Sequence, residues 1–164
     1  MPIHPFEIVC DSECRVLILG SFPSVRSRQE GFYYAHPRNR FWTTLAAVFS
    51  EVTPSKTEDR KAFLLRHHIA LWDAAYSCDI QASSDATMRH VVPTDLSQIF
   101  DQAQIELVLL NGGQAGKIYE RCQANRFNVP YQIMPSTSPA NAACSQEKLI
   151  SCWGKALRQV LEKE

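Results

Sequence analysis

The residues best suited to chemistry lie in one short segment, "YYAHPRNRFW" at residues 33–42. It places Asn39 between Arg38 and Arg40, just before a run with helical character. A carboxamide can pair with the edge of a nucleobase, its NH2 donating to a carbonyl oxygen and its own oxygen accepting from a ring N–H. Three interpretations of Asn39 therefore stand side by side: a helix N-cap, part of a solvated basic loop, or an amide presented to a nucleic acid.

Positive charge is concentrated around the same segment. The whole chain is neutral, with 17 basic and 17 acidic residues, so no global field favours nucleic acid. Residues 21–42 contain four arginines and one acid, a local charge of +3 that can hold a few phosphates. The arginines, for which a solvated face is the alternative interpretation, are Arg26, Arg28, Arg38 and Arg40.

Length and composition predict one ordinary globular domain spanning residues 1–164, since a chain of this size can bury a full core and 45% of it is hydrophobic. No apolar run is long enough to cross a bilayer, and the N-terminus lacks the pattern of a signal peptide. We therefore expect a cytoplasmic protein whose six cysteines are reduced. Cys10 and Cys14 are too far apart for a typical zinc or iron–sulfur pair, and the adjacent His67 and His68 would diverge on a helix, so we expect no metal and no cofactor.

Four apolar runs, typical of strands covered on both faces, predict a central four-stranded, mainly parallel sheet. They lie at residues 15–20, 68–73, 105–112 and 129–134. Helical patterns occupy the spaces between these runs and the end of the chain. They cover residues 40–49, 55–68, 112–124 and 145–164, the second opening with Ser55 and Glu58 at the spacing of a capping box. The expected fold is an α/β three-layer α/β/α sandwich.

In such folds ligands bind beyond the carboxyl ends of the strands. The residues expected there are small, polar or proline: Gly20–Ser24, Asp73, Asn111–Gly113 and Pro135–Pro139. Each segment could also be a plain turn, and Asn111 could cap the helix that follows it. Together they suggest a site in which backbone N–H groups and small polar side chains face a ligand.

The order of these segments resembles that of a known family. "LILGSFPS", "EGFYYAHPRNRFW", "ALWD", "VVPTDL", "LLNGG" and "MPSTSPAN", over about residues 16–141, are similar to the uracil-DNA glycosylase superfamily, and most closely to its hypoxanthine-DNA (deoxyinosine) glycosylase branch. The resemblance implies a base-excision repair enzyme that hydrolyses the N-glycosidic bond of deaminated bases, hypoxanthine first, and leaves an abasic site. Asn39 matches the asparagine regarded as catalytic in this branch. Whether it holds the attacking water or the leaving base stays open.

The resemblance also implies roles for other residues. Contacts to the base are expected from Gly20, Ser21, Phe22, Asp73 and Asn111. Contacts to DNA are expected from Ser24, Arg38, Arg40, Ser136, Thr137, Ser138 and Pro139. Phe22 replaces the aspartate, and Met134 the histidine, of the best-known members of the superfamily, which argues against strong uracil activity.

The expected partner is double-stranded or single-stranded DNA with deaminated bases, and the expected state is a monomer that does not bind membranes. No lysine is clearly placed among the strand-end residues to form an imine with the sugar, so we expect a monofunctional glycosylase. Alternatives are a uracil or mismatch-type DNA glycosylase, a non-catalytic relative that binds damaged DNA, and an α/β enzyme acting on free nucleotides or nucleosides. The first two alternatives act on or bind DNA, for which the "PSTSPAN" loop would be useful. The third alternative would not need this loop.

Overall fold

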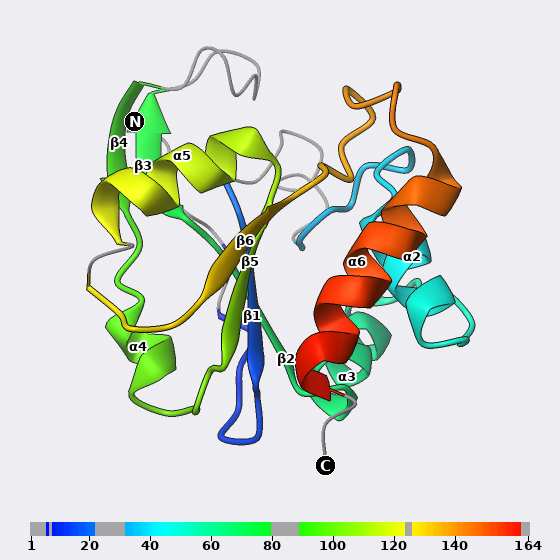
Figure 1. The fold of residues 1–164 in the computed structure, drawn as a ribbon, viewed down its shortest axis with the longest axis horizontal. Coiled ribbons are helices and arrows are strands. Elements are labelled where there is room, and N and C mark those ends of the chain that lie inside the picture. Colours follow the sequence, from blue (N-terminus) through cyan, green and yellow to red (C-terminus); the bar gives the residue numbers. More distant parts are fainter. Residues whose placement is uncertain (1–5, 7, 22–31, 80–88, 124–125, 162–164) are drawn as a thin grey trace.

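The structure, a computed structural model, describes residues 6, 8–21, 32–79, 89–123 and 126–161 (Figure 1). Its centre is a four-stranded sheet in the order β2-β1-β5-β6, in which every neighbouring pair is parallel. The strands are β1 (Val16–Gly20), β2 (Ile69–Asp73), β5 (Leu107–Asn111) and β6 (Tyr131–Met134). Each lies within a run predicted from the sequence, so the predicted four-stranded sheet is confirmed.

The apolar runs form strands because both faces of the sheet are covered. Every residue of β1 and β2 is buried, as expected for strands packed between two layers. β6, at the edge of the sheet, is more accessible, with Ile133 47% exposed. The order of strands places the switch in connection direction between β1 and β5, where an open α/β sheet binds its ligand.

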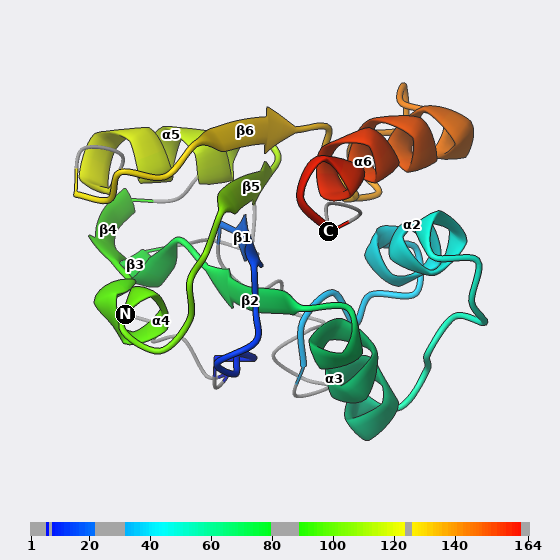
Figure 2. The same ribbon diagram turned by 60° about the horizontal axis from the view of Figure 1, so that its bottom comes forward.

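Helices cover both faces, which confirms the three-layer α/β/α fold (Figures 1 and 2). One face is covered by α2 (Phe41–Val48), α3 (Thr57–Arg66) and α6 (Gln146–Leu161), and the other by α5 (Gly113–Cys122) with the short α4 (Ser97–Phe100). Trp153 and Leu157 of α6 are fully buried, as the predicted apolar face requires. None of the described helices has both the length and the apolar composition to cross a membrane.

Two features differ from the sequence analysis. β3 (Ala75–Asp79) and β4 (Arg89–Pro93) form a separate antiparallel pair, which was not predicted because it is short and its register shifts twice. The predicted capping box was wrong: α3 begins at Thr57, and its N-cap, Lys56, makes no side-chain hydrogen bond. Glu58 and Asp59 in the first turn instead favour the helix through its dipole.

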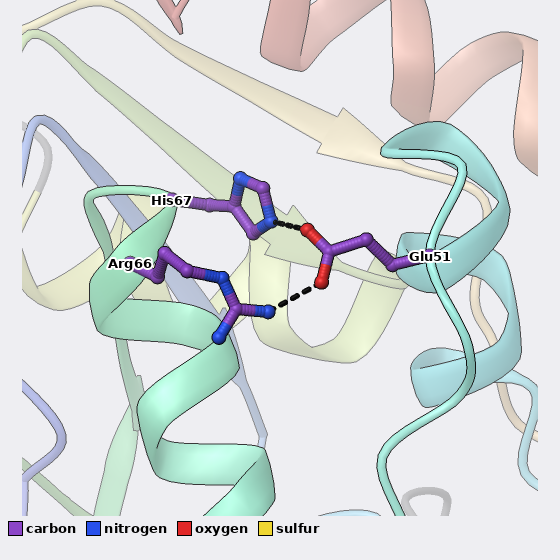
Figure 3. A network of polar contacts seen from close by, with 3 residues as sticks. All are labelled: Glu51, Arg66 and His67. Carbon is purple, nitrogen blue, oxygen red and sulfur yellow. Dashed lines mark hydrogen bonds and ion pairs between the residues drawn. The ribbon is translucent and has the colours of Figure 1, made fainter.

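An ion-pair network joins the end of α2 to the end of α3 (Figure 3). Glu51 accepts hydrogen bonds from Arg66 and His67 through different carboxylate oxygens. The His67 ring stacks on Phe49, with the ring centroids 3.9 Å apart. The pKa of Glu51 is lowered, first by the hydrogen bond to His67 and then by the one to Arg66.

Replacement of Glu51 should therefore destabilise the protein in a pH-dependent way. Since the folded pKa lies below the unfolded one, the contribution of Glu51 is present above its ordinary pKa of 4.5 and is lost as the pH falls through the lowered value. Urea unfolding of wild type and Glu51→Gln should differ at about pH 6, and the difference should shrink as the pH falls through the lowered pKa of Glu51. The control is Glu13→Gln, an exposed carboxylate on a loop, which should show no such difference. A gap between wild type and Glu51→Gln that does not change with pH would count against the network.

Candidate active site

Asn39 lies in a tight turn that leads directly into α2. The Asn39 N–H donates to the carbonyl of His36 at 2.9 Å, which closes a turn with Pro37 in its second position. The Asn39 Oδ1 accepts from the N–H of Phe41, the first residue of α2, at 2.9 Å. The N-cap interpretation of Asn39 was wrong, because the N-cap of α2 is Arg40 and it makes no side-chain hydrogen bond. Asn39 lies one residue earlier, and its carbonyl satisfies the otherwise unpaired N–H at the start of the helix.

The loop between β6 and α6 meets this turn at Thr137. The Thr137 hydroxyl donates to Asn39 Oδ1 at 2.8 Å, and the N–H of Arg40 donates to the Thr137 carbonyl at 3.0 Å. Thr137 is 1% exposed. A residue expected to touch DNA thus lies beneath the loop surface, and its hydroxyl is used to hold Asn39.

Asn111, the last residue of β5, completes the connection. Its Oδ1 accepts from the Thr137 N–H at 3.0 Å, and its Nδ2 donates to the Thr137 hydroxyl oxygen at 3.0 Å. We call Asn39, Thr137 and Asn111 the amide relay. It joins the end of a central strand to two loops that are distant in the sequence.

The relay limits the hydrogen bonds that the Asn39 carboxamide could make to a base. Asn39 Oδ1 accepts two hydrogen bonds, which uses both of its lone pairs. Its Nδ2 has no hydrogen-bond partner among the described residues. Simultaneous donation to a keto oxygen and acceptance from a ring N–H, which the sequence analysis considered, therefore does not fit this geometry; donation alone does.

A second polar group lies at the end of β1. Gly20 is opposite Asp73 in the sheet register, and a Cβ at Gly20 would lie 2.4 Å from Asp73 Oδ1 and 2.6 Å from the Tyr34 hydroxyl oxygen. Asp73 is 3% exposed. The pKa of Tyr33 is raised, first by burial of the Tyr33 side chain and then by the charge of Asp73. Tyr34 stacks on Phe41, with the ring centroids 4.2 Å apart. Glycine at this strand end is what allows the carboxylate and the hydroxyl to approach the backbone.

The Arg40 side chain binds the loop between β6 and α6. Its Nη1 donates to the Cys144 carbonyl at 2.6 Å, and its Nη2 donates to the Asn141 carbonyl at 3.0 Å. A phosphate contact from Arg40 stays a prediction, since the guanidinium already binds two carbonyls here. Arg38 is exposed, as a DNA contact requires.

The serines of the same loop are held through their oxygens. Ser136 Oγ accepts from the N–H of Ser138, and Ser138 Oγ accepts from the N–H of Ala140, each at 3.1 Å. Each hydroxyl keeps its proton for an outside acceptor such as a phosphate oxygen. Pro139 and Ala140 are exposed at the tip.

The structure brings together some predicted site residues and says nothing of others. Gly20 and Asp73 lie opposite each other at the carboxyl ends of β1 and β2, and Thr137 links Asn39 to Asn111, the last residue of β5. The Ser21 carbonyl accepts from the N–H of Ala75 at 2.9 Å. Phe22 and Ser24, together with Arg26 and Arg28, lie outside the described residues. In the part of the chain that is described, no group of three or more His, Cys, Asp or Glu residues could hold a metal ion.

Comparison with known proteins identifies the family of this chain. The model of the uracil DNA glycosylase superfamily matches residues 6–161. The chain belongs to the uracil-DNA glycosylase superfamily. The resemblance seen in the sequence is thereby confirmed at that level.

Relatives within the superfamily match almost the whole chain. "Hypoxanthine DNA glycosylase" of Methanosarcina barkeri is 30% identical over 156 residues, 94% of this chain and 97% of that protein. A protein of the same name from Methanosarcina acetivorans is 28% identical over 145 residues, covering 87% and 90% of the two chains. A solution NMR structure of a candidate uracil DNA glycosylase from M. acetivorans has a TM-score of 0.82 at 28% identity, covering 96% of this chain and 97% of that one.

The close approach at Gly20 predicts that substitution by alanine lowers the free energy of unfolding much more at Gly20 than at Gly113. Gly20→Ala would place a methyl group against buried Asp73, so we expect a loss of roughly 1–3 kcal/mol in the free energy of unfolding. Gly113→Ala is the matched control because nothing lies within 4 Å of its added Cβ, and it should be neutral or slightly stabilising. Urea unfolding of both variants measures this. Equal stability of the two would contradict the packing described for Gly20.

Proposed function

We propose that this chain is a monofunctional DNA glycosylase that hydrolyses the N-glycosidic bond of deaminated bases in DNA, hypoxanthine first, and leaves an abasic site. The observation that carries the proposal is the Asn39 carboxamide, whose carbonyl is occupied and whose NH2 group is available as a donor. Membership of the superfamily and the names of the Methanosarcina relatives support the same activity.

The donor matches the change that deamination makes. Deamination turns the N6 amine of adenine, a donor, into the O6 carbonyl of hypoxanthine, an acceptor. An amide held as a donor pairs with O6, whereas against adenine it would face another donor. Each polar group left unpaired in this way costs ~1–3 kcal/mol, which rejects the undamaged base.

The same donor suits the chemistry. The glycosidic bond should break ahead of water attack, so negative charge develops on the departing base. A fixed donor at that position stabilises the transition state without reorganisation. We therefore assign Asn39 to the leaving base, because its carbonyl has no lone pair left with which to accept a proton from water. Asp73, whose carboxylate lies against Gly20, is our candidate for contact with the water or the base.

DNA would be held by the loop between β6 and α6 and by the segment before α2. Extruding a nucleotide costs a few kcal/mol, and Pro139 and Ala140 are placed at an exposed tip that can fill the gap. Ser136 and Ser138 would donate to phosphates. We propose that residues 1–164 act as one domain, as a cytoplasmic monomer without a cofactor, on double-stranded or single-stranded DNA.

A uracil-type activity is the second candidate, because O4 of uracil is also an acceptor for the Asn39 amide and because the NMR relative is described as a candidate uracil DNA glycosylase. Met134, buried at the end of β6, cannot donate a hydrogen bond to a departing base as a histidine could. This favours hypoxanthine as the main substrate.

The direct test is base release by wild type and Asn39→Ala. Fluorescent duplexes carrying inosine, uracil, xanthine or no lesion are incubated with enzyme in excess and then treated with alkali. Wild type should release hypoxanthine fastest, and Asn39→Ala should lower the single-turnover rate by ~10²–10³, the usual cost of removing one transition-state donor. The control is Asn128→Ala, an exposed asparagine before the amino end of β6, which should behave as wild type.

Three outcomes would count against the proposal. An Asn39→Ala variant as fast as wild type would remove the assigned role of Asn39. A wild-type protein that binds inosine duplexes without producing alkali-labile sites would indicate a non-catalytic relative. Cleavage of free inosine would indicate a nucleosidase.

Arg38 provides a separate test of DNA binding. Arg38→Ala should weaken binding to lesion and undamaged duplexes alike and lower the slope of log Kd against log salt by about 1, as expected for one phosphate contact. Arg121→Ala, an exposed arginine in the last turn of α5, should leave the slope unchanged. Titrations by fluorescence anisotropy at several salt concentrations measure both. An unchanged slope for Arg38→Ala would contradict a phosphate contact.

A further inference from the structure

We propose that Thr137 and Asn111 are positioning residues that lock the Asn39 carboxamide as a hydrogen-bond donor, so that the enzyme accepts only bases with an acceptor atom at the contacted edge. The inference rests on the proposed function and adds to it the two residues that fix the orientation of the amide. Neither residue needs to touch the base to act in this way.

The direction of every bond in the relay is forced by backbone groups at its two ends. The N–H of Phe41 can only donate, so the atom of Asn39 facing it is the oxygen. The N–H of Thr137 can only donate, so it faces the oxygen of Asn111, and the Asn111 amine must face the Thr137 hydroxyl. That hydroxyl has one proton, and because it accepts from Asn111 it donates to Asn39.

Two barriers therefore oppose a flip of the Asn39 amide. A flipped Asn39 would place its NH2 against the Phe41 N–H and would also lose the Thr137 hydroxyl as a donor. Thr137 cannot turn its proton elsewhere, because Asn111 presents a donor to it and Asn111 is itself held by a backbone N–H. Without Thr137 and Asn111, the N–H of Phe41 alone would hold the orientation.

The relay also strengthens the donor that it orients. Hydrogen bonds in a chain polarise one another, and two donors on the same carbonyl oxygen draw electron density from the amide nitrogen. The N–H groups of Asn39 become better donors to an atom on which negative charge is developing. Loss of the relay should accordingly lower the rate of the chemical step more than the affinity for DNA.

The test is a double-mutant cycle between Asn39 and Thr137, read by single-turnover release of hypoxanthine and by duplex affinity. Thr137→Val removes the hydroxyl at similar volume and should slow release about tenfold, as for one lost hydrogen bond, with Kd for the duplex unchanged. Thr137→Ser keeps the hydroxyl and should restore the rate to within about threefold of wild type. In an Asn39→Ala background, Thr137→Val should have no further effect.

Asn111→Asp is a second route to the same result. Its added carboxylate oxygen would accept the Thr137 proton and take it away from Asn39, so it should slow release as Thr137→Val does and also have no effect in the Asn39→Ala background. Thr43→Val is the matched control, since the exposed Thr43 hydroxyl donates to the Arg40 carbonyl and lies outside the relay. Thermal melts check that each variant is folded.

The outcomes separate the inference from the function on which it rests. Multiplicative effects of Asn39→Ala and Thr137→Val, a Thr137→Ser variant as slow as Thr137→Val, or a loss confined to duplex affinity would each overturn the relay while leaving the glycosylase proposal intact. The last of these would instead support the DNA contact expected for Thr137 from the sequence. Failure of wild type to release any base would overturn the proposed function itself.

Discussion

The hydrogen bond from the Thr137 hydroxyl to Asn39 Oδ1 is the contact on which the site depends. It joins segments 98 positions apart in the sequence, one before α2 and one after β6. The parallel sheet makes the meeting possible, since it gathers the carboxyl ends of its strands at one edge. Asn111 ends β5 beside β1, where the direction of the connections switches, and so the relay is anchored where this fold class binds ligands.

The surroundings of the relay limit how far it can move. Arg40 ties the loop to the start of α2 through two carbonyls, and the Trp153 Nε1 of α6 donates to the Pro135 carbonyl at 3.0 Å. On the other side Gly112 has φ of +101°, and a Cβ there would lie 3.1 Å from Ser136 Cβ. The chain can pass from β5 into α5 this close to the loop because this residue is glycine. Donor and loop are thus held by the same packed framework.

The sequence was sufficient for the framework and for part of the site. Continuous apolar runs predicted the four central strands, and periodic apolar faces predicted the helices that cover them, because burial on both faces or on one stripe leaves a direct mark on composition. Asn111 and Asp73 were found from their places at the ends of predicted strands, whereas Asn39 was found from the segment before a predicted helix and from the family resemblance. The β3–β4 pair was missed because a short pair with shifting register leaves no alternation to detect.

The hydrogen-bond partners within the site could not be predicted from the sequence in this way. Nothing in "PSTSPAN" distinguishes the threonine that turns inward from the serines that stay near the surface, since all three carry a hydroxyl. Arg40 likewise has the same local context as Arg38, yet it bonds to carbonyls 101 and 104 positions away. Such choices depend on which loop lies opposite, and that is decided by the tertiary fold.

Under the proposed function, stability and selectivity would depend on the same hydrogen bonds in this site. Thr137 is almost fully buried, and an unsatisfied hydroxyl or N–H there would cost ~1–3 kcal/mol, so folding alone favours a complete relay. Completing it leaves one group without a partner in the described part of the chain, the NH2 of Asn39. Because Asn39 is only half-buried, water can satisfy that group in the unbound protein at little cost. Under the proposed function, a base that displaced this water would have to supply an acceptor in its place, and that requirement would turn an ordinary packing constraint into discrimination between a keto group and an amine.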